Sequence, residues 1–229
     1  IVIIILIARA KKRQSILNKM PDGRPVDKVR GYDKFVAANP GFNPEEFYTK
    51  VRNAFMAIQD AWQKQDLAGV RRFLSDGVWQ RFESQFRMMR TLKQKNTIDK
   101  LEIHNVSIDR IDVDGSYDIV HVAIHASIID RFVCETDASL NSGGKEDFVE
   151  YWSFIKKRGA VAKDMYGKPS CPNCGGDLSG ESGESTKCPY CGSITNSGAF
   201  DWVLAEITQA DDYIVIHPRL RATENLADK

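Results

Sequence analysis

Four of the five cysteines occur in two short pairs, and their spacing predicts a metal site. Cys171 and Cys174 form the first pair, Cys188 and Cys191 form the second, and each pair reads Cys-Pro-x-Cys-Gly. Two intervening residues allow one tight turn to present both thiolates, and the glycine that follows permits the positive φ that such a turn needs. We expect one structural Zn²⁺ here, because four protein ligands leave no coordination position for a catalytic water.

Disulfides, a redox pair and an iron site are the alternatives to zinc for these cysteines. Disulfides are common in small secreted domains, whereas this chain is long enough to form a core without them. A redox pair would need only one Cys-x-x-Cys, next to a βαβ unit that the sequence does not predict. Iron accepts the same four thiolates, so the pattern leaves zinc and iron both open. The fifth cysteine, Cys134, is expected to pack as a small apolar residue.

Outside the cysteines, the sequence offers little that is typical of catalysis. His121 and His125 are four residues apart in a predicted strand, roughly 13 Å along it. That separation is too long for one metal ion, and we expect both rings on the outer face of the sheet, at the surface or facing a partner. No glycine-rich phosphate loop, serine nucleophile elbow or second metal motif is found. Candidates for lining a binding pocket are the tryptophans Trp62, Trp79 and Trp152.

The hydrophobic periodicity predicts helices first and strands afterwards. Apolar residues recur at three- and four-residue steps in the first part of the chain, then alternate with polar ones after about residue 97. The predicted helices are 26–38, 43–62, 67–74 and 75–92. The predicted strands are 103–113, 117–133, 148–159 and 200–209, with one further strand at 213–218. This order predicts an α+β fold in which helices pack on an antiparallel sheet, with the cysteine segment in the hairpin between the third and fourth strands.

The composition is that of a globular protein, and the amino terminus resembles the end of a membrane segment. Of the 229 residues, 42% are hydrophobic and 28% charged, and the net charge of +1 excludes a surface built as a whole for nucleic acid. Residues 1–8 are apolar and a basic cluster follows at 9–13. Eight helical residues span about 12 Å, less than the ~30 Å hydrocarbon core. We expect a truncated transmembrane segment with the domain on the cytoplasmic side, and a buried strand is the alternative.

These patterns together predict a domain organisation. Residues 1–13 end a transmembrane segment with its basic flank, and residues 14–40 form a linker and an amphipathic helix. Residues 41–169 and 194–217 form the α+β domain, 170–193 a zinc-ribbon insertion, and 218–229 a polar tail.

Three segments resemble a known family. They are "FNPEEFYTKVRNAFMAIQDAWQKQDLAGVRRFLSDGVWQRFESQF", "EYWSFIKKRG" and "FDWVLAEI". The order of elements is similar to the cone-shaped nuclear-transport-factor-two-like fold. The segments look like the C-terminal domain of the forty-four-kilodalton subunit of the mitochondrial inner-membrane import translocase and its bacterial relatives. The resemblance implies a non-enzymatic, membrane-associated binding domain, and an N-terminal transmembrane segment as in the bacterial relatives. The cysteine insertion departs from those relatives.

The sequence therefore predicts a membrane-tethered, non-enzymatic scaffold whose partner is a protein or a peptide, with a lipid as a further candidate. One alternative is a ribosome- or RNA-binding adaptor that uses the zinc ribbon. The loop between the cysteine pairs is acidic, however, so nucleic acid is not the expected partner. The second alternative is a pocket enzyme of the isomerase or dehydratase type. It would require a carboxylate on the inner, apolar face of the sheet, and none is evident in the pattern.

Deletion of residues 170–193 should leave the α+β domain folded. The strand patterns on both sides indicate that the insertion is an appendage of a hairpin and is not part of the domain core. A cooperative thermal transition of the deleted chain, followed by circular dichroism, would agree with this. Global unfolding would show that the insertion is misplaced.

Overall fold

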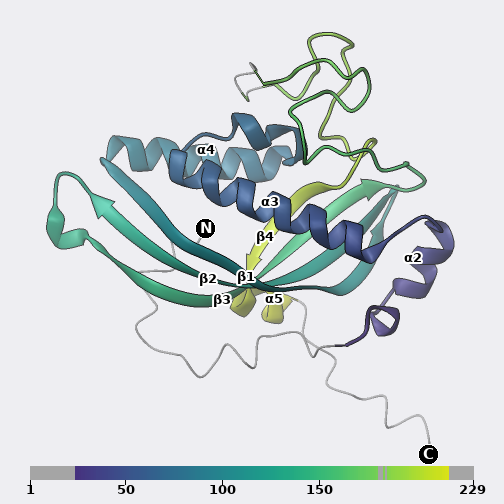
Figure 1. Ribbon diagram of the computed structural model, residues 1–229, viewed down its shortest axis with the longest axis horizontal. Helices are drawn as coiled ribbons and strands as arrows, with labels where there is room; N and C mark the ends of the chain where they lie inside the picture. Colours follow the sequence, from purple (N-terminus) through teal and green to yellow (C-terminus); the bar gives the residue numbers. More distant parts are fainter. Residues whose placement is uncertain (1–23, 180–182, 184, 217–229) are drawn as a thin grey trace, which may run out of the picture.

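The structure is a computed structural model that describes residues 24–179, 183 and 185–216 (Figure 1). A curved sheet carries helices α3 and α4 across one face and the short helix α5 against the other. The helices are α2 (Tyr32–Ala38), α3 (Pro44–Lys64), α4 (Asp76–Thr91) and α5 (Ala210–Ile216), with short 3-10 turns η2 (Val26–Lys28), η3 (Ala68–Phe73) and η4 (Ala138–Leu140). The predicted transmembrane segment (1–13) and polar tail (218–229) lie outside the described residues. Within the described part, no helix combines the length and the apolar character needed to cross a membrane.

Four antiparallel strands form the sheet in the order β1-β2-β3-β4. Their bounds are β1 (Gln94–Asp114), β2 (Tyr117–Cys134), β3 (Ser142–Lys157) and β4 (Val203–Gln209). The predicted β1–β2 turn is present, and Gly115 has the positive φ (55°) that a tight hairpin requires. Helices on an antiparallel, curved sheet confirm the predicted α+β class.

The long helices begin where their capping residues predict. The side chain of Asn43 accepts a hydrogen bond from the backbone N–H of Glu45 at 3.0 Å, and Pro44 occupies the first turn. The rings of Phe42 and Phe47 lie 5.6 Å apart across this start, as in a hydrophobic staple. These contacts fix how α3 enters the domain.

Aromatic side chains fill the space between α3 and the sheet. Phe55 of α3 is fully buried, and its ring lies 5.2 Å from that of Trp152 and 6.4 Å from that of Phe148, both on β3. Beneath them, β2 contributes alternate apolar side chains to the same core, which are Val120, Val122, Ile124, Ala126 and Ile128. The interior of the cone is therefore packed with side chains.

The predicted strand at 213–218 is wrong for the part of it that the structure describes. The chain leaves β4 at Gln209 and turns at once into helix α5, whose first turn holds Asp211 and Asp212. Acidic residues at a helix amino terminus are favoured by the helix dipole. The ring of Tyr213 stacks on that of Tyr151 at 3.8 Å, so α5 covers part of the sheet's outer face.

The predicted helix 26–38 is divided in two. Gly31 adopts a φ of 87°, and a side chain there would collide with the backbone of Ile111. This close approach accompanies a hydrogen bond from Ile111 N–H to the carbonyl of Arg30 at 2.9 Å. The following α2 docks on the domain through Phe35, which is 2% exposed.

Replacing Phe55 by alanine should lower the free energy of unfolding by about 3–5 kcal/mol, because it leaves a cavity beneath α3. Met56, the next residue on the same helix, is 45% exposed, so Met56→Ala should change it by less than about 0.5 kcal/mol. Urea unfolding of both variants tests the expectation, and equal effects would contradict it.

Candidate metal centre and binding surfaces

The two cysteine pairs lie in the connection between β3 and β4, and each forms the same tight turn. In the first, Cys171 N–H donates to the Gly176 carbonyl and Gly175 N–H donates back to the Cys171 carbonyl, both at 2.8 Å. In the second, Gly192 N–H donates to the Cys188 carbonyl at 2.9 Å. Gly175 and Gly192 have φ values of 75° and 74°, so both turns use the conformation that glycine makes accessible.

These turns bring the four sulfur atoms together as a tetrahedral ion requires. The Sγ atoms of Cys171 and Cys191 are 3.7 Å apart and those of Cys174 and Cys188 are 3.8 Å apart. All four lie within 4.8 Å of one another, and all four cysteines are free thiols. Zinc–sulfur bonds of about 2.3 Å in a regular tetrahedron separate the sulfurs by about 3.8 Å, whereas a disulfide needs about 2.05 Å. We call these four residues the cysteine cage.

Polar groups around Cys191 favour its thiolate form. The Ser193 hydroxyl lies 3.4 Å from the Cys191 sulfur, and the side-chain amide of Asn173 lies 3.6 Å from it. The side chain and backbone of Ser193, followed by Asn173, lower the pKa of Cys191 to about 6. Since a thiolate is the form that binds a metal ion, this cysteine is prepared to act as a ligand.

The chain that follows the second cysteine pair contacts the helices of the domain. The side-chain amide of Asn196 donates to the carbonyl of Leu74 at 2.9 Å and to the carboxylate of Asp76 at 3.0 Å. Arg71 forms an ion pair with the same Asp76. These bonds hold the end of the segment against η3 and the start of α4.

The three candidate tryptophans lie in or beside the core. Trp62 is 5% exposed and packs on the rings of Phe82 and Phe86, and Trp152 lies under α3. Trp79 is half-buried, with the Arg71 guanidinium 4.9 Å from its ring. A binding role for these three residues stays a prediction.

A fourth tryptophan, Trp202, lines a cavity of 310 Å³ that we call the corner pocket. It lies where the α2–α3 connection meets the ends of β3 and the segment that follows. Its apolar wall includes Phe42 and the highly exposed Val161 (81%). Polar groups come from Asn39, Asn43, Glu46, Lys50 and Lys156.

Two lysines of the corner pocket are held by specific partners. Lys156 donates to the carbonyl of Ala160 at 2.7 Å, and burial lowers its pKa. Lys50 pairs with Asp201 at 2.5 Å, and that carboxylate is fully buried. Burial raises the pKa of Asp201, against the opposing effect of Lys50. The pocket thus combines an apolar wall with a few polar groups held in place, among them Lys156 and the Lys50–Asp201 ion pair, which is typical of a ligand site.

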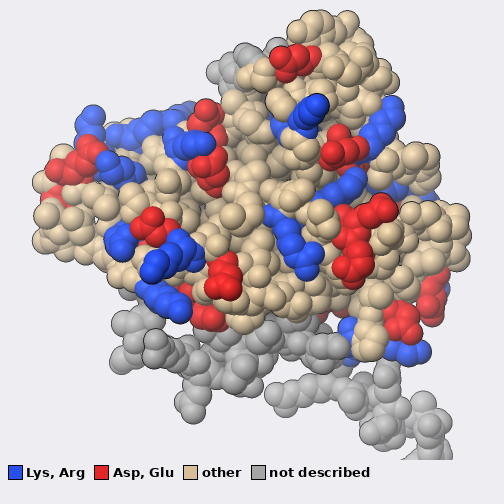
Figure 2. Space-filling model, in the orientation of Figure 1, with Lys and Arg blue, Asp and Glu red and all other residues tan. Residues whose placement is uncertain are grey.

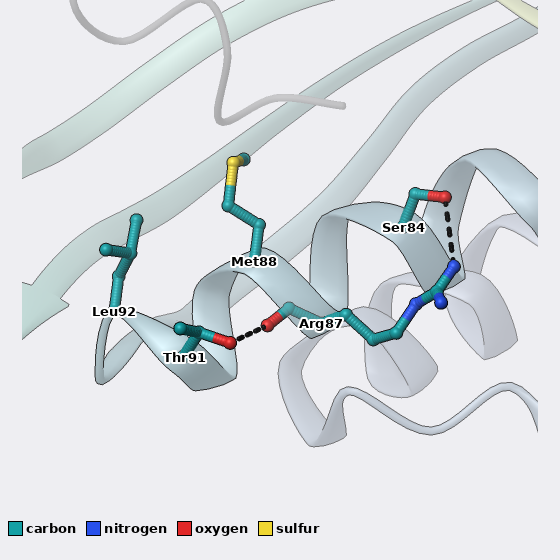
Figure 3. Close-up of a pocket in the computed structure, with 5 residues that line it drawn as sticks. All are labelled: Ser84, Arg87, Met88, Thr91 and Leu92. Atoms are coloured by element: carbon teal, nitrogen blue, oxygen red, sulfur yellow. Dashed lines mark hydrogen bonds between the residues drawn. The ribbon is translucent and has the colours of Figure 1, made fainter.

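A second, shallower hollow of 420 Å³ lies on α4 (Figure 3). Met88 and Leu92 rise from the helix there, 54% and 48% exposed, while Arg87 turns away to bond Ser84. Only this helix and the residue that follows it line the hollow. It is an apolar surface strip, more open to solvent than the corner pocket although its volume is larger.

The charges on the face shown in Figure 2 are mixed, with basic and acidic side chains interspersed. This face does not present the continuous positive surface that nucleic acid binding requires.

Three inward carboxylates of the described strands were missed by the sequence analysis: Asp118 and Asp130 of β2, each 1% exposed and hydrogen-bonded to Asn39 and Asn96, and Glu150 of β3. Glu150 of β3 is 2% exposed, and its two oxygens accept hydrogen bonds from Trp152 Nε1 at 3.0 Å and from Gln209 Nε2 at 2.8 Å. Both oxygens are occupied by core partners, so this carboxylate is bonded as a structural group. The pattern hid it because its neighbours Phe148 and Trp152 on the same face are apolar.

The predicted surface position of the histidines is wrong for His121. It is 6% exposed and hydrogen-bonded to Ser153 at 2.8 Å, and its ring lies 6.1 Å from that of Tyr213. Helix α5, which takes the place of the predicted strand, covers it through Tyr213. His125 is partly exposed, and the structure brings it next to His104, a pairing that the sequence analysis did not anticipate.

The sequence of this chain matches a known protein family. A family model described as the Tim44-like domain matches residues 29–166, more than half of the chain. The chain belongs to the Tim44-like family, as the sequence resemblance predicted, and the match ends before the first cysteine of the cage. No curated protein matches the chain. Among solved structures, the crystal structure of the intermembrane space region of the chloroplast protein ARC6 is similar, with 11% identity and a TM-score of 0.36. The match covers 73% of this chain and 96% of that one.

Replacing Lys50 by methionine should lower the free energy of unfolding at pH 7 by about 3 kcal/mol, because it leaves the Asp201 carboxylate buried and unpaired. The loss should shrink as the pH falls, since protonation of Asp201 removes the unpaired charge. The matched control is Lys64→Met, which removes an exposed pair with Asp60 and should cost less than about 1 kcal/mol. Equal losses in the two variants, or a loss that grows in acid, would contradict the assignment.

Proposed function

We propose that the chain is a membrane-tethered, non-enzymatic binding domain whose cysteine cage holds a structural zinc ion. The observation that carries the binding function is the corner pocket, an apolar recess with fixed lysines at the edge of a domain whose interior is filled. The partner class that fits best is a protein or peptide that inserts an apolar side chain beside Trp202 and Phe42 and places an acidic group near Lys156. A lipid is the second candidate for the same recess.

Membership of the Tim44-like family supports the membrane association, and the apolar stretch 1–8 with its basic flank supports a tether at the amino terminus. The basic flank places the domain on the cytoplasmic side in this proposal. The inward carboxylates of Asp118, Asp130 and Glu150 are buried and hydrogen-bonded within the domain, which supports the non-enzymatic assignment, because a general acid or base needs an oxygen that can reach a substrate.

Zinc in the cysteine cage is supported by the sulfur separations and by the two matching turns that present the cysteines. The residues that would hold the ion are Cys171, Cys174, Cys188 and Cys191. Four thiolates complete a tetrahedral shell, so the ion would stabilise the two turns and would not activate water.

The purified chain should contain one zinc ion, and Cys174→Ser or Cys191→Ser should remove most of it. Both cysteines are exposed, so these changes affect the ligand set more than the packing. Cys134→Ser is the control and should keep the metal, because Cys134 lies at the end of β2. Elemental analysis by mass spectrometry gives the ion and its amount. A wild-type chain without metal, or a Cys191→Ser chain with as much as the wild type, would contradict the proposal.

If the corner pocket is the binding site, Val161→Asp should abolish capture of the partner from solubilised membranes. The change places a charge on the apolar wall of the pocket. Val113→Asp, at another exposed valine, on β1 (53% exposed), should leave capture unchanged. Quantitative mass spectrometry of the captured proteins compares the two variants with the wild type. The pocket is not the binding site if both variants capture the same proteins as the wild type.

A further inference from the structure

Three side chains from three neighbouring strands meet on the outer face of the sheet. They are His104 of β1, His125 of β2 and Asp147 of β3, and we call them the outer triad. The two imidazole rings lie 4.8 Å apart. Asp147 approaches both, with Oδ1 2.7 Å from His125 Nε2 and Oδ2 4.0 Å from His104 Nε2. One possible ligand atom from each of the three residues lies within 4.8 Å of the other two.

A β-bulge brings His104 to this face. In an unbroken strand His104 would share the inner face with Val106 and Ile108, because side chains alternate. The β1–β2 register instead shifts between Ile103 and Asn105, so that His104 is the extra residue. Bulges re-aim side chains in this way and are common beside functional sites. The turn of His104 away from the core is therefore a specific feature of this strand.

We propose that the outer triad binds a divalent transition-metal ion through His104, His125 and Asp147. Two imidazoles and one carboxylate are a ligand set that zinc and its neighbours in the first transition row accept. Three protein ligands leave at least one position open, which water or an acidic group of a partner can fill. This site differs from the cysteine cage, whose four sulfur ligands form a closed shell.

The geometry needs only a small adjustment to accept the ion. With metal–ligand distances of about 2.0–2.2 Å, tetrahedral donor atoms lie about 3.3–3.6 Å apart. The two carboxylate separations, 2.7 and 4.0 Å, bracket that range. Asp147 has a side chain that is 48% exposed, so it can make the shift of about half to one ångström that is required, while His125 is held in the sheet at 18%. The Ser127 hydroxyl lies 2.8 Å from His104 Nε2 and positions that ring until a metal ion replaces the contact.

Equilibrium dialysis of the full chain against Zn²⁺ tests the site, with bound metal measured by mass spectrometry. The wild type should bind one ion more than the cysteine cage accounts for. His104→Ala, His125→Ala and Asp147→Asn should each weaken this additional ion by more than about 100-fold, since loss of an outer-shell partner alone weakens metal binding 10–100-fold. Asp99→Asn is the matched control, because Asp99 is an exposed carboxylate of the same strand as His104, paired with Arg131, and it should leave the binding unchanged.

Cobalt distinguishes the outer triad from the cage. Co²⁺ added to chains whose cage already holds its metal should give the spectrum of nitrogen and oxygen ligands, without the intense charge-transfer band of cobalt–thiolate bonds. The proposal is overturned if the wild type binds no ion beyond the cage, or if the triad variants bind the additional ion as tightly as Asp99→Asn. It is also overturned if the added Co²⁺ gives only the thiolate band. Because cage occupancy is measured on the same samples, failure of the outer triad is distinct from failure of the zinc proposal.

Discussion

The packing of α3 into the curved sheet is the interaction on which the other features depend. Phe55 meets Trp152 and Phe148 at the centre of that contact, and all three rings are removed from water. Burial of side chains of this size supplies most of the driving force for folding a domain. Because the rings occupy the interior of the cone, a ligand has to bind at an edge or on a face.

The packing of α3 on the sheet leaves the candidate sites at three places around the sheet. The corner pocket forms where α3 begins, and Asp201 ties α3 to the approach to β4 through Lys50. The cysteine cage lies beside η3, and Ser75, which caps the start of α4 just after η3, joins β4 through a hydrogen bond from its N–H to the Leu204 carbonyl at 2.9 Å. The outer triad uses the opposite face, where α5 leaves part of the sheet uncovered. Each site is thus placed by a contact of the core, although none of them lies inside it.

The sequence predicted those parts of the structure that local chemistry determines. Asn43 with Pro44 marks the start of α3, Asp114 with Gly115 marks the β1–β2 turn, and the spacing of the four cysteines leads to sulfurs at tetrahedral separations. The parts that failed depend on contacts between distant segments. Gly31 breaks a helical pattern because the backbone of Ile111 approaches it. The apolar run after Tyr213 folds as a helix because the sheet's outer face offers Tyr151 as a stacking partner. The outer triad was missed for the same reason, since a bulge that no local pattern marks determines where His104 points.

The central claim is that the chain holds a protein-binding surface at a membrane, and a co-flotation measurement tests it most directly. Lipid vesicles are floated through a density gradient with the captured partner and one of three chains: the full sequence, a chain that starts at residue 24, or Val161→Asp. The account predicts that the partner rises with the vesicles only when the full, unchanged sequence is present. It also predicts that Val161→Asp floats without the partner, and that the shortened chain stays at the bottom with it. Flotation of the shortened chain, or of the partner with Val161→Asp, would contradict the claim.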